Sequence, residues 1–143
     1  MELFFDTAPC YGYGKSEELL GQALKPVREK VIICTLFSHN NPDGSYDFNA
    51  EKIRPIQEGS LWRWQTDNVD MLLLHNPPPE LMDGQLAAQQ YETLEALKAA
   101  GSLHDYGISL DWREEVELAV ETMCPNCMRG RRFDPTLMLR QAH

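Results

Sequence analysis

Short apolar segments alternate with amphipathic segments along most of this 143-residue sequence, and this alternation limits the folds that the chain can adopt. The apolar segments have the length and composition of buried strands, and the segments between them have the apolar spacing of helices. Strands that alternate with helices run parallel and are joined by right-handed crossovers. The order therefore predicts an α/β protein, with strands near residues 2–6, 31–37, 70–75 and 105–109.

A helix is expected after each strand, at residues 16–25, 49–65, 85–101 and 112–123. Ser16 and Asp111 are predicted to cap the first and last of these helices, because their side-chain oxygens accept hydrogen bonds from the free N–H groups of a helix start. Gly101 is predicted to close the third helix. Residues 38–48 are rich in turn-forming residues and predict a polar loop.

Two architectures fit this order of elements: a doubly wound sheet and part of a (β/α)8 barrel. A complete barrel takes about 250 residues, and this sequence supplies roughly four βα units. Residues 1–123 are expected to form this unit. Residues 124–143 lack the apolar alternation and are expected to form an irregular tail.

The charge of the chain excludes several classes of partner. A net charge of -9 argues against nucleic acid, which requires a basic surface, and against an anionic membrane surface. No apolar run approaches the roughly 20 residues of a membrane span. The sequence start lacks the basic and apolar stretches of a signal peptide. A cytoplasmic protein is expected.

Cys124 and Cys127 form an isolated C-x-x-C pair. A structural zinc site needs a second pair or histidines at suitable spacing, and His143 is the only histidine that follows. Two plain thiols are expected, and no metal site is predicted; a metal or redox role remains the alternative.

The segment FFDTAPCYGYGKSEELLGQAL, residues 4–24, resembles the signature of the aldo-keto reductases. Four further blocks are similar to that family in the same order: REKVIICT, SLWRWQTDNVDMLLLHNPPP, LEALKAAGSLHDYGIS and WREEVELAVE. The resemblance covers nearly all of residues 3–122. It implies a (β/α)8 barrel, of which this sequence corresponds to about the second to fifth βα units, as in a truncated or frame-shifted reading frame.

The resemblance also implies an NADPH-dependent reductase of small aldehydes or ketones. Asp6, Tyr11 and His75 match three of the four catalytic side chains of the family. The fourth position, a lysine in the family, is Leu36 in this chain.

The chemistry of carbonyl reduction explains why Leu36 is the most informative departure from the family pattern. Hydride addition leaves negative charge on the carbonyl oxygen, so a proton has to reach that oxygen. A tyrosine donates it poorly, because a free phenol has a pKa near 10. A neighbouring ammonium lowers that pKa, and an aspartate holds the ammonium in place. Leu36 therefore removes the activator of Tyr11 and the expected counter-ion of Asp6.

A second departure concerns the cofactor. In the family a Ser-Asn pair holds the nicotinamide amide; this chain has Ser109 followed by Leu110. The resemblance places the phosphate- and adenosine-binding groups in later strands. Beside the metal or redox role of the C-x-x-C pair, two functions stay open: a carbonyl reductase with impaired activity, and a non-catalytic half-barrel that binds a partner. The open edges of a half-barrel also predict self-association.

Overall fold

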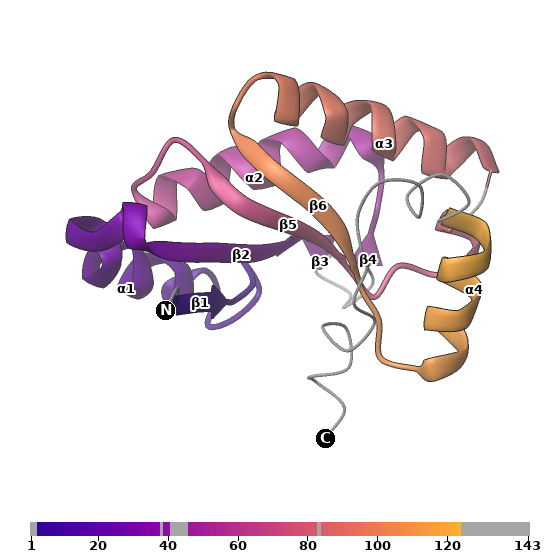
Figure 1. Ribbon diagram of the computed structural model, residues 1–143, viewed down its shortest axis with the longest axis horizontal. Coiled ribbons are helices and arrows are strands. Elements are labelled where there is room, and N and C mark those ends of the chain that lie inside the picture. Colours follow the sequence, from indigo (N-terminus) through magenta and orange to yellow (C-terminus); the bar gives the residue numbers. More distant parts are fainter. Residues whose placement is uncertain (1–2, 38, 41–45, 83, 124–143) are drawn as a thin grey trace.

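The computed structural model of the protein describes residues 3–37, 39–40, 46–82 and 84–123. Strands and helices alternate through most of this range (Figure 1). The main strands are β1 (Leu3–Asp6), β2 (Val31–Phe37), β5 (Val69–His75) and β6 (Leu103–Ser109). The helices are α1 (Lys15–Leu24), α2 (Ala50–Trp64), α3 (Gly84–Ala99) and α4 (Arg113–Met123), with short 3-10 turns at η1 (Lys25–Lys30) and η2 (Pro79–Leu81).

The four main strands form one parallel sheet in the order β1-β2-β5-β6. Neighbours in the sheet follow one another along the chain, whereas a doubly wound sheet reverses its strand order at a switch point. Right-handed crossovers between strands added in one direction place the helices on one face. The predicted (β/α)8-type arrangement of about four βα units is therefore confirmed, and the doubly wound alternative is wrong.

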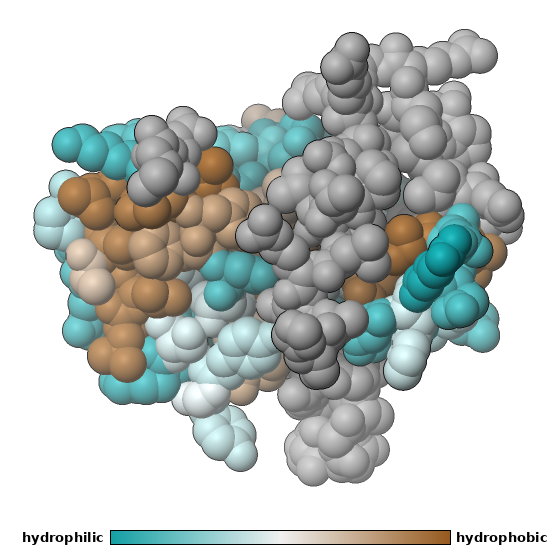
Figure 2. All heavy atoms as spheres, turned by 60° about the horizontal axis from the view of Figure 1, so that its bottom comes forward, coloured by the Kyte–Doolittle hydropathy of each residue, from teal (hydrophilic) through white to brown (hydrophobic). Residues whose placement is uncertain are grey.

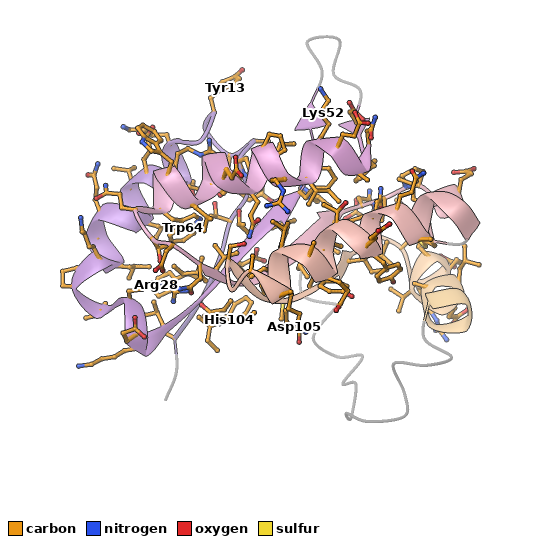
Figure 3. All side chains as sticks on the ribbon, turned by 90° about the horizontal axis from the view of Figure 1, so that it is seen from above. Tyr13, Arg28, Lys52, Trp64, His104 and Asp105 are labelled. Carbon is orange, nitrogen blue, oxygen red and sulfur yellow. The ribbon has the colours of Figure 1, made fainter. Side chains whose placement is uncertain are left out.

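The hydrophobic core lies between the sheet and its helices. In β2, Ile33 and Phe37 belong to this core, together with Leu72 from β5 and Trp64 from α2. Trp64 projects inward from the end of α2 (Figure 3), and α2 lies beside α3 over the strands (Figure 1). Side chains alternate along a strand, so Cys34 and Leu36 lie on the opposite, inner face of the sheet, whereas Thr35 shares the face of Ile33 and Phe37.

Both predicted helix caps are wrong. Helix α1 begins after Gly14, whose backbone has a φ of 85°, and Ser16 lies inside the first turn with its Oγ 2.7 Å from Oγ1 of Thr7. Helix α4 begins after Trp112, whose N–H donates to Oε2 of Glu115 at 3.2 Å. This bond from the N–H before the helix to the third helical residue is one half of a capping box; the Trp112 side chain has no acceptor to supply the other half.

The other helix predictions agree with the structure. Helix α2 has Asn49 as its N-cap and continues through Pro55. Gly101, with a φ of 77°, follows the end of α3 as predicted. Within the predicted loop 38–48, the two-residue strands β3 (His39–Asn40) and β4 (Tyr46–Asp47) pair antiparallel, which the sequence analysis did not anticipate.

The predicted tail, residues 124–143, lies outside the described residues, as do Cys124 and Cys127.

Candidate active site at the strand ends

The carboxyl ends of the strands place Asp6 and His75 on one face of the sheet. Asp6 ends β1 and lies opposite Cys34 on β2. Leu36, two residues beyond Cys34, lies on the same face and is opposite Leu73. His75 ends β5 two residues after Leu73 and therefore also shares this face. Three of the four predicted catalytic positions thus lie at the same end of the inner face.

Tyr11 reaches this face from the loop between β1 and α1. The loop turns back because Gly12, Tyr13 and Gly14 all have positive φ angles, of 60°, 55° and 85°. Tyr13 points away from the molecule (Figure 3). The ring of Tyr11 instead meets the imidazole of His75 edge to face, with 6.3 Å between ring centroids and 87° between planes. The fold therefore joins residues from the first loop and the third strand of the main sheet.

The electrostatic state of Asp6 depends on burial and on two neighbours. Burial raises the pKa of the Asp6 carboxyl, while the nearby His75 and a hydrogen bond from the Cys34 thiol lower it. Burial also raises the pKa of Cys34, and the adjacent Asp6 carboxylate raises it further. Cys34 is therefore a neutral hydrogen-bond donor. The sequence analysis did not identify this contact, although Cys34 lies only two residues before Leu36.

Burial favours the neutral form of the His75 imidazole. Burial lowers its pKa, and Asp111 and Asp6 raise it to a smaller extent. Its Nδ1 atom is buried and has no hydrogen-bond partner among the described residues. A neutral imidazole can donate or accept one hydrogen bond at each nitrogen, which is the state needed to orient a carbonyl oxygen.

Leu36 supplies no charge to this site. Its side chain is only 1% exposed, but it lies outside the main hydrophobic cluster of the described residues, as expected for the inner face. A leucine here fills space between strand ends. It cannot stabilise a phenolate, which a cation at the same place would do.

Ser109 ends β6 directly opposite His75 and is half-buried. The backbone N–H of Asn76 donates to the Ser109 carbonyl oxygen at 2.7 Å, and its side-chain Nδ2 donates to Oδ2 of Asp111 at 2.8 Å. The Oδ1 atom of Asn76 is buried without a hydrogen-bond partner in the described part of the chain. Leu110 is 7% exposed and belongs to the hydrophobic core. Asn76 was not identified from the sequence, and its place directly after a strand end is the signal that could have found it.

No group of three or more His, Cys, Asp or Glu side chains that could hold a metal ion occurs in the described ranges. Across the same residues, no helix combines the length and the apolar character that crossing a membrane would take.

The fold and the strand-end cluster together define a segment of a (β/α)8 barrel with polar side chains at the carboxyl ends of its strands. Residues 2–130 match the family model described as Aldo/keto reductase family. The chain belongs to the aldo/keto reductase family.

Individual relatives agree with this assignment. The chain is 34% identical to aldo-keto reductase YhdN of Bacillus subtilis over 108 residues, which are 73% of this chain and 31% of the relative. It is 35% identical to L-galactose dehydrogenase of Arabidopsis thaliana over 109 residues, 74% of this chain and 33% of the relative. The chain thus spans about a third of the length of these curated relatives.

Solved structures show the same fold. The holo form of aldo-keto reductase AKR11C1 from Bacillus halodurans superimposes with a TM-score of 0.71 at 28% identity, over 82% of this chain and 40% of that chain. An aldo/keto reductase from Klebsiella pneumoniae, solved in complex with NADP and acetate, gives a TM-score of 0.66 at 28% identity, over 84% of this chain and 38% of that chain.

Proposed function

We propose that this chain carries part of the reaction centre of an NADPH-dependent carbonyl reductase, and that Leu36 impairs its chemistry. The convergence of Asp6, Tyr11 and His75 at one end of the inner face carries this proposal. Active sites of (β/α)8 barrels lie at the carboxyl ends of the strands, where residues distant in sequence meet. The substrate is a small aldehyde or ketone.

In this proposal Tyr11 donates the proton that the carbonyl oxygen needs once hydride has reached the carbonyl carbon. The imidazole of His75, in edge contact with the Tyr11 ring, orients the carbonyl oxygen. Asp6 would hold a cation beside Tyr11, but residue 36 is a leucine. The Tyr11 phenol is then a weaker acid in the transition state, and turnover falls.

The strand ends fit one part of a nicotinamide cofactor. The hydroxyl of Ser109 and the buried acceptor Oδ1 of Asn76 could bond the two ends of a carboxamide group. Leu110 does not fit, because its apolar side chain is part of the core. When bound, NADPH would supply the hydride. The structure of the Klebsiella pneumoniae relative in complex with NADP supports this choice of cofactor.

A second candidate function is partner binding through the open sheet. Apolar side chains gather at the end of the molecule that holds β1 (Figure 2), where Leu3 and Phe4 are 49% and 53% exposed. β1 pairs only with β2 among the described strands. Exposed edges with apolar side chains favour association. Self-association and cytoplasmic location stay predictions.

Reductase activity is tested in a protein in which these residues are joined to the remaining strands of a relative's barrel. NADPH oxidation with a small aldehyde is compared between Leu36 and Leu36→Lys, with Tyr11→Phe as the inactive control. We expect Leu36→Lys to be faster by about 10²-fold or more, the usual contribution of a positioned acid. Equal rates in the two proteins would contradict the proposed role of residue 36.

A further inference from the structure

Glu17 is a fully buried carboxylate that the proposed chemistry does not use. Its side chain is 0% exposed, yet both oxygens accept short hydrogen bonds. Oε1 accepts from Oγ1 of Thr35 at 2.6 Å and from Nε1 of Trp64 at 3.2 Å, and Oε2 accepts from Nε of Arg63 at 2.6 Å. A buried charge is tolerated only when it is paired and hydrogen-bonded, and Glu17 meets both conditions. The carboxylate therefore ties α1 to β2 and to the end of α2.

The face of α1 that carries Glu17 is shaped for this contact. Glu17 and Gly21 share one side of α1, and Gly14, just before the helix, also faces α2. A Cβ at Gly21 would lie 2.6 Å from the carbonyl oxygens of Arg63 and Trp64, so the two helix backbones touch. A Cβ at Gly14 would lie 2.7 Å from Cδ of Arg63. The Arg63 side chain therefore crosses the end of the loop that carries Tyr11.

The turn that holds Glu17 also holds Tyr11. The N–H of Ser16, one residue before Glu17, donates to the carbonyl oxygen of Tyr11 at 3.4 Å. The Ser16 hydroxyl bonds to Thr7, whose N–H donates to the Cys34 carbonyl oxygen at 3.2 Å. A change in the position of this turn would therefore move the Tyr11 loop relative to the strand ends.

The other end of the network reaches the strand of the reaction centre. Thr35 stands between Cys34, the neighbour of Asp6, and Leu36. Its hydroxyl points to the helix side and binds Glu17, while the two flanking side chains lie on the inner face. One carboxylate thus contacts the strand that carries position 36 and the helical turn that anchors Tyr11.

We propose that Glu17 is a positioning residue for Tyr11: its buried carboxylate fixes the loop of Tyr11 against β2 and so sets the contact between Tyr11 and His75. The inference rests on the proposed function only in giving Tyr11 a chemical role. The position of Tyr11 itself is measurable without cofactor or substrate.

The test follows two aromatic contacts in the full chain by nuclear Overhauser effects between ring protons. The Tyr11–His75 contact reports the proposed effect, and the Phe37–Phe48 contact, with ring centroids 6.1 Å apart, reports general loosening of the core. Glu17→Gln keeps the size of the side chain but replaces an acceptor oxygen by an NH2 group that faces N–H or O–H donors. Glu18→Gln removes a neighbouring carboxylate, which pairs with Lys15 on the surface, and is the matched control.

We expect Glu17→Gln to lose the Tyr11–His75 cross-peak and to retain the Phe37–Phe48 cross-peak, and Glu18→Gln to retain both. If Glu17→Gln does not unfold cooperatively, Thr35→Val is the deciding variant. It removes the hydrogen bond from Thr35 and leaves those from Arg63 and Trp64 to the Glu17 carboxylate. Selective loss of the Tyr11–His75 cross-peak in Thr35→Val supports the proposal. Retention of both cross-peaks, or loss of both, in the deciding variant overturns it.

A failure of the proposed function looks different. Absence of NADPH binding or turnover would leave these cross-peaks unchanged, whereas a Tyr11 that keeps its place without the Glu17 network would refute the positioning role alone.

Discussion

The thiol of Cys34 hydrogen-bonds to the carboxylate of Asp6 across the first two strands of the sheet. Asp6 is therefore accompanied by a neutral donor and by the nearby His75. The leucine at position 36 leaves it without the ammonium that the family resemblance leads one to expect. A thiol satisfies one lone pair but adds no positive charge. The pKa of Asp6 consequently remains above its usual value, since burial outweighs both neighbours.

The first prediction concerns Leu36→Lys. Position 36 is buried, and a buried ammonium is costly unless it is paired, so the lysine should be tolerated better with Asp6 than in an Asp6→Ala background. We expect a coupling free energy of about 1–3 kcal/mol in a double-mutant cycle measured by urea unfolding. Leu36→Met, which changes volume little and adds no charge, should be additive with Asp6→Ala. Additivity of the lysine variant would mean that residues 6 and 36 do not face each other.

The second prediction concerns the cofactor. The chain spans about a third of its curated relatives, and the family resemblance places the phosphate- and adenosine-binding groups in later strands, so we expect this chain to bind NADPH with a dissociation constant of about 1 mM or weaker, equivalent to about -4 kcal/mol. Isothermal titration calorimetry measures this directly, with the Klebsiella pneumoniae relative as positive control. Micromolar binding would refute the prediction.

Leu110→Asn is expected to lower stability rather than to tighten cofactor binding. Leu110 belongs to the core, and a buried amide without partners costs about 1–3 kcal/mol. Thermal unfolding of the variant, together with the same titration, separates the two effects. Tighter NADPH binding at unchanged stability would show that residue 110 faces the cofactor rather than the core.

A third prediction compares two glycines that face the same partner. Gly21→Ala should destabilise the protein by about 2–3 kcal/mol, because the new methyl group meets backbone carbonyl oxygens that cannot move away. Gly59→Ala should stay within about 1 kcal/mol of the parent, since its methyl group meets only the far end of the Arg63 side chain, at 3.2 Å, and alanine favours the helix. Urea unfolding of both variants provides the measurement. Similar losses would indicate that α1 and α2 are not in backbone contact.

The fourth prediction concerns pH. Burial lowers the pKa of His75 below its usual value of 6.5, so the unfolded chain takes up a proton at this residue more readily than the folded protein. The contribution of His75 to the free energy of unfolding is therefore complete above pH 6.5. It is lost as the pH falls from 6.5 toward the lower pKa of His75 in the folded protein. His75→Gln should remove this part of the pH dependence. The free energy of unfolding of both proteins, measured across this range, gives the difference, and parallel curves would contradict the prediction.

The sequence by itself determined the four main strands, the four helices and their approximate ranges. Buried strands and amphipathic helices have local periodicities, so their ranges could be predicted from neighbouring residues. Asp6 and His75 end apolar runs, and parallel strands present their carboxyl ends at one edge, so the structure brings these two residues to the same face as predicted. Gly101 was likewise identified correctly from its place after a helical pattern.

Tertiary structure decided the contacts that depend on distant partners. Ser16 has the chemistry of a helix cap, but its hydroxyl binds Thr7 on the strand side. Gly14 precedes the helix instead, because the backbone there is left-handed and because a Cβ at this position would lie 2.7 Å from Cδ of Arg63. In the sequence, Glu17 resembles a surface residue of a first helical turn, but in the structure α2 packs against it and buries it. In each case the side chain had several local alternatives of similar energy. Burial against a segment tens of residues away selected one, because desolvation makes an unsatisfied polar group far more costly inside the protein than in water.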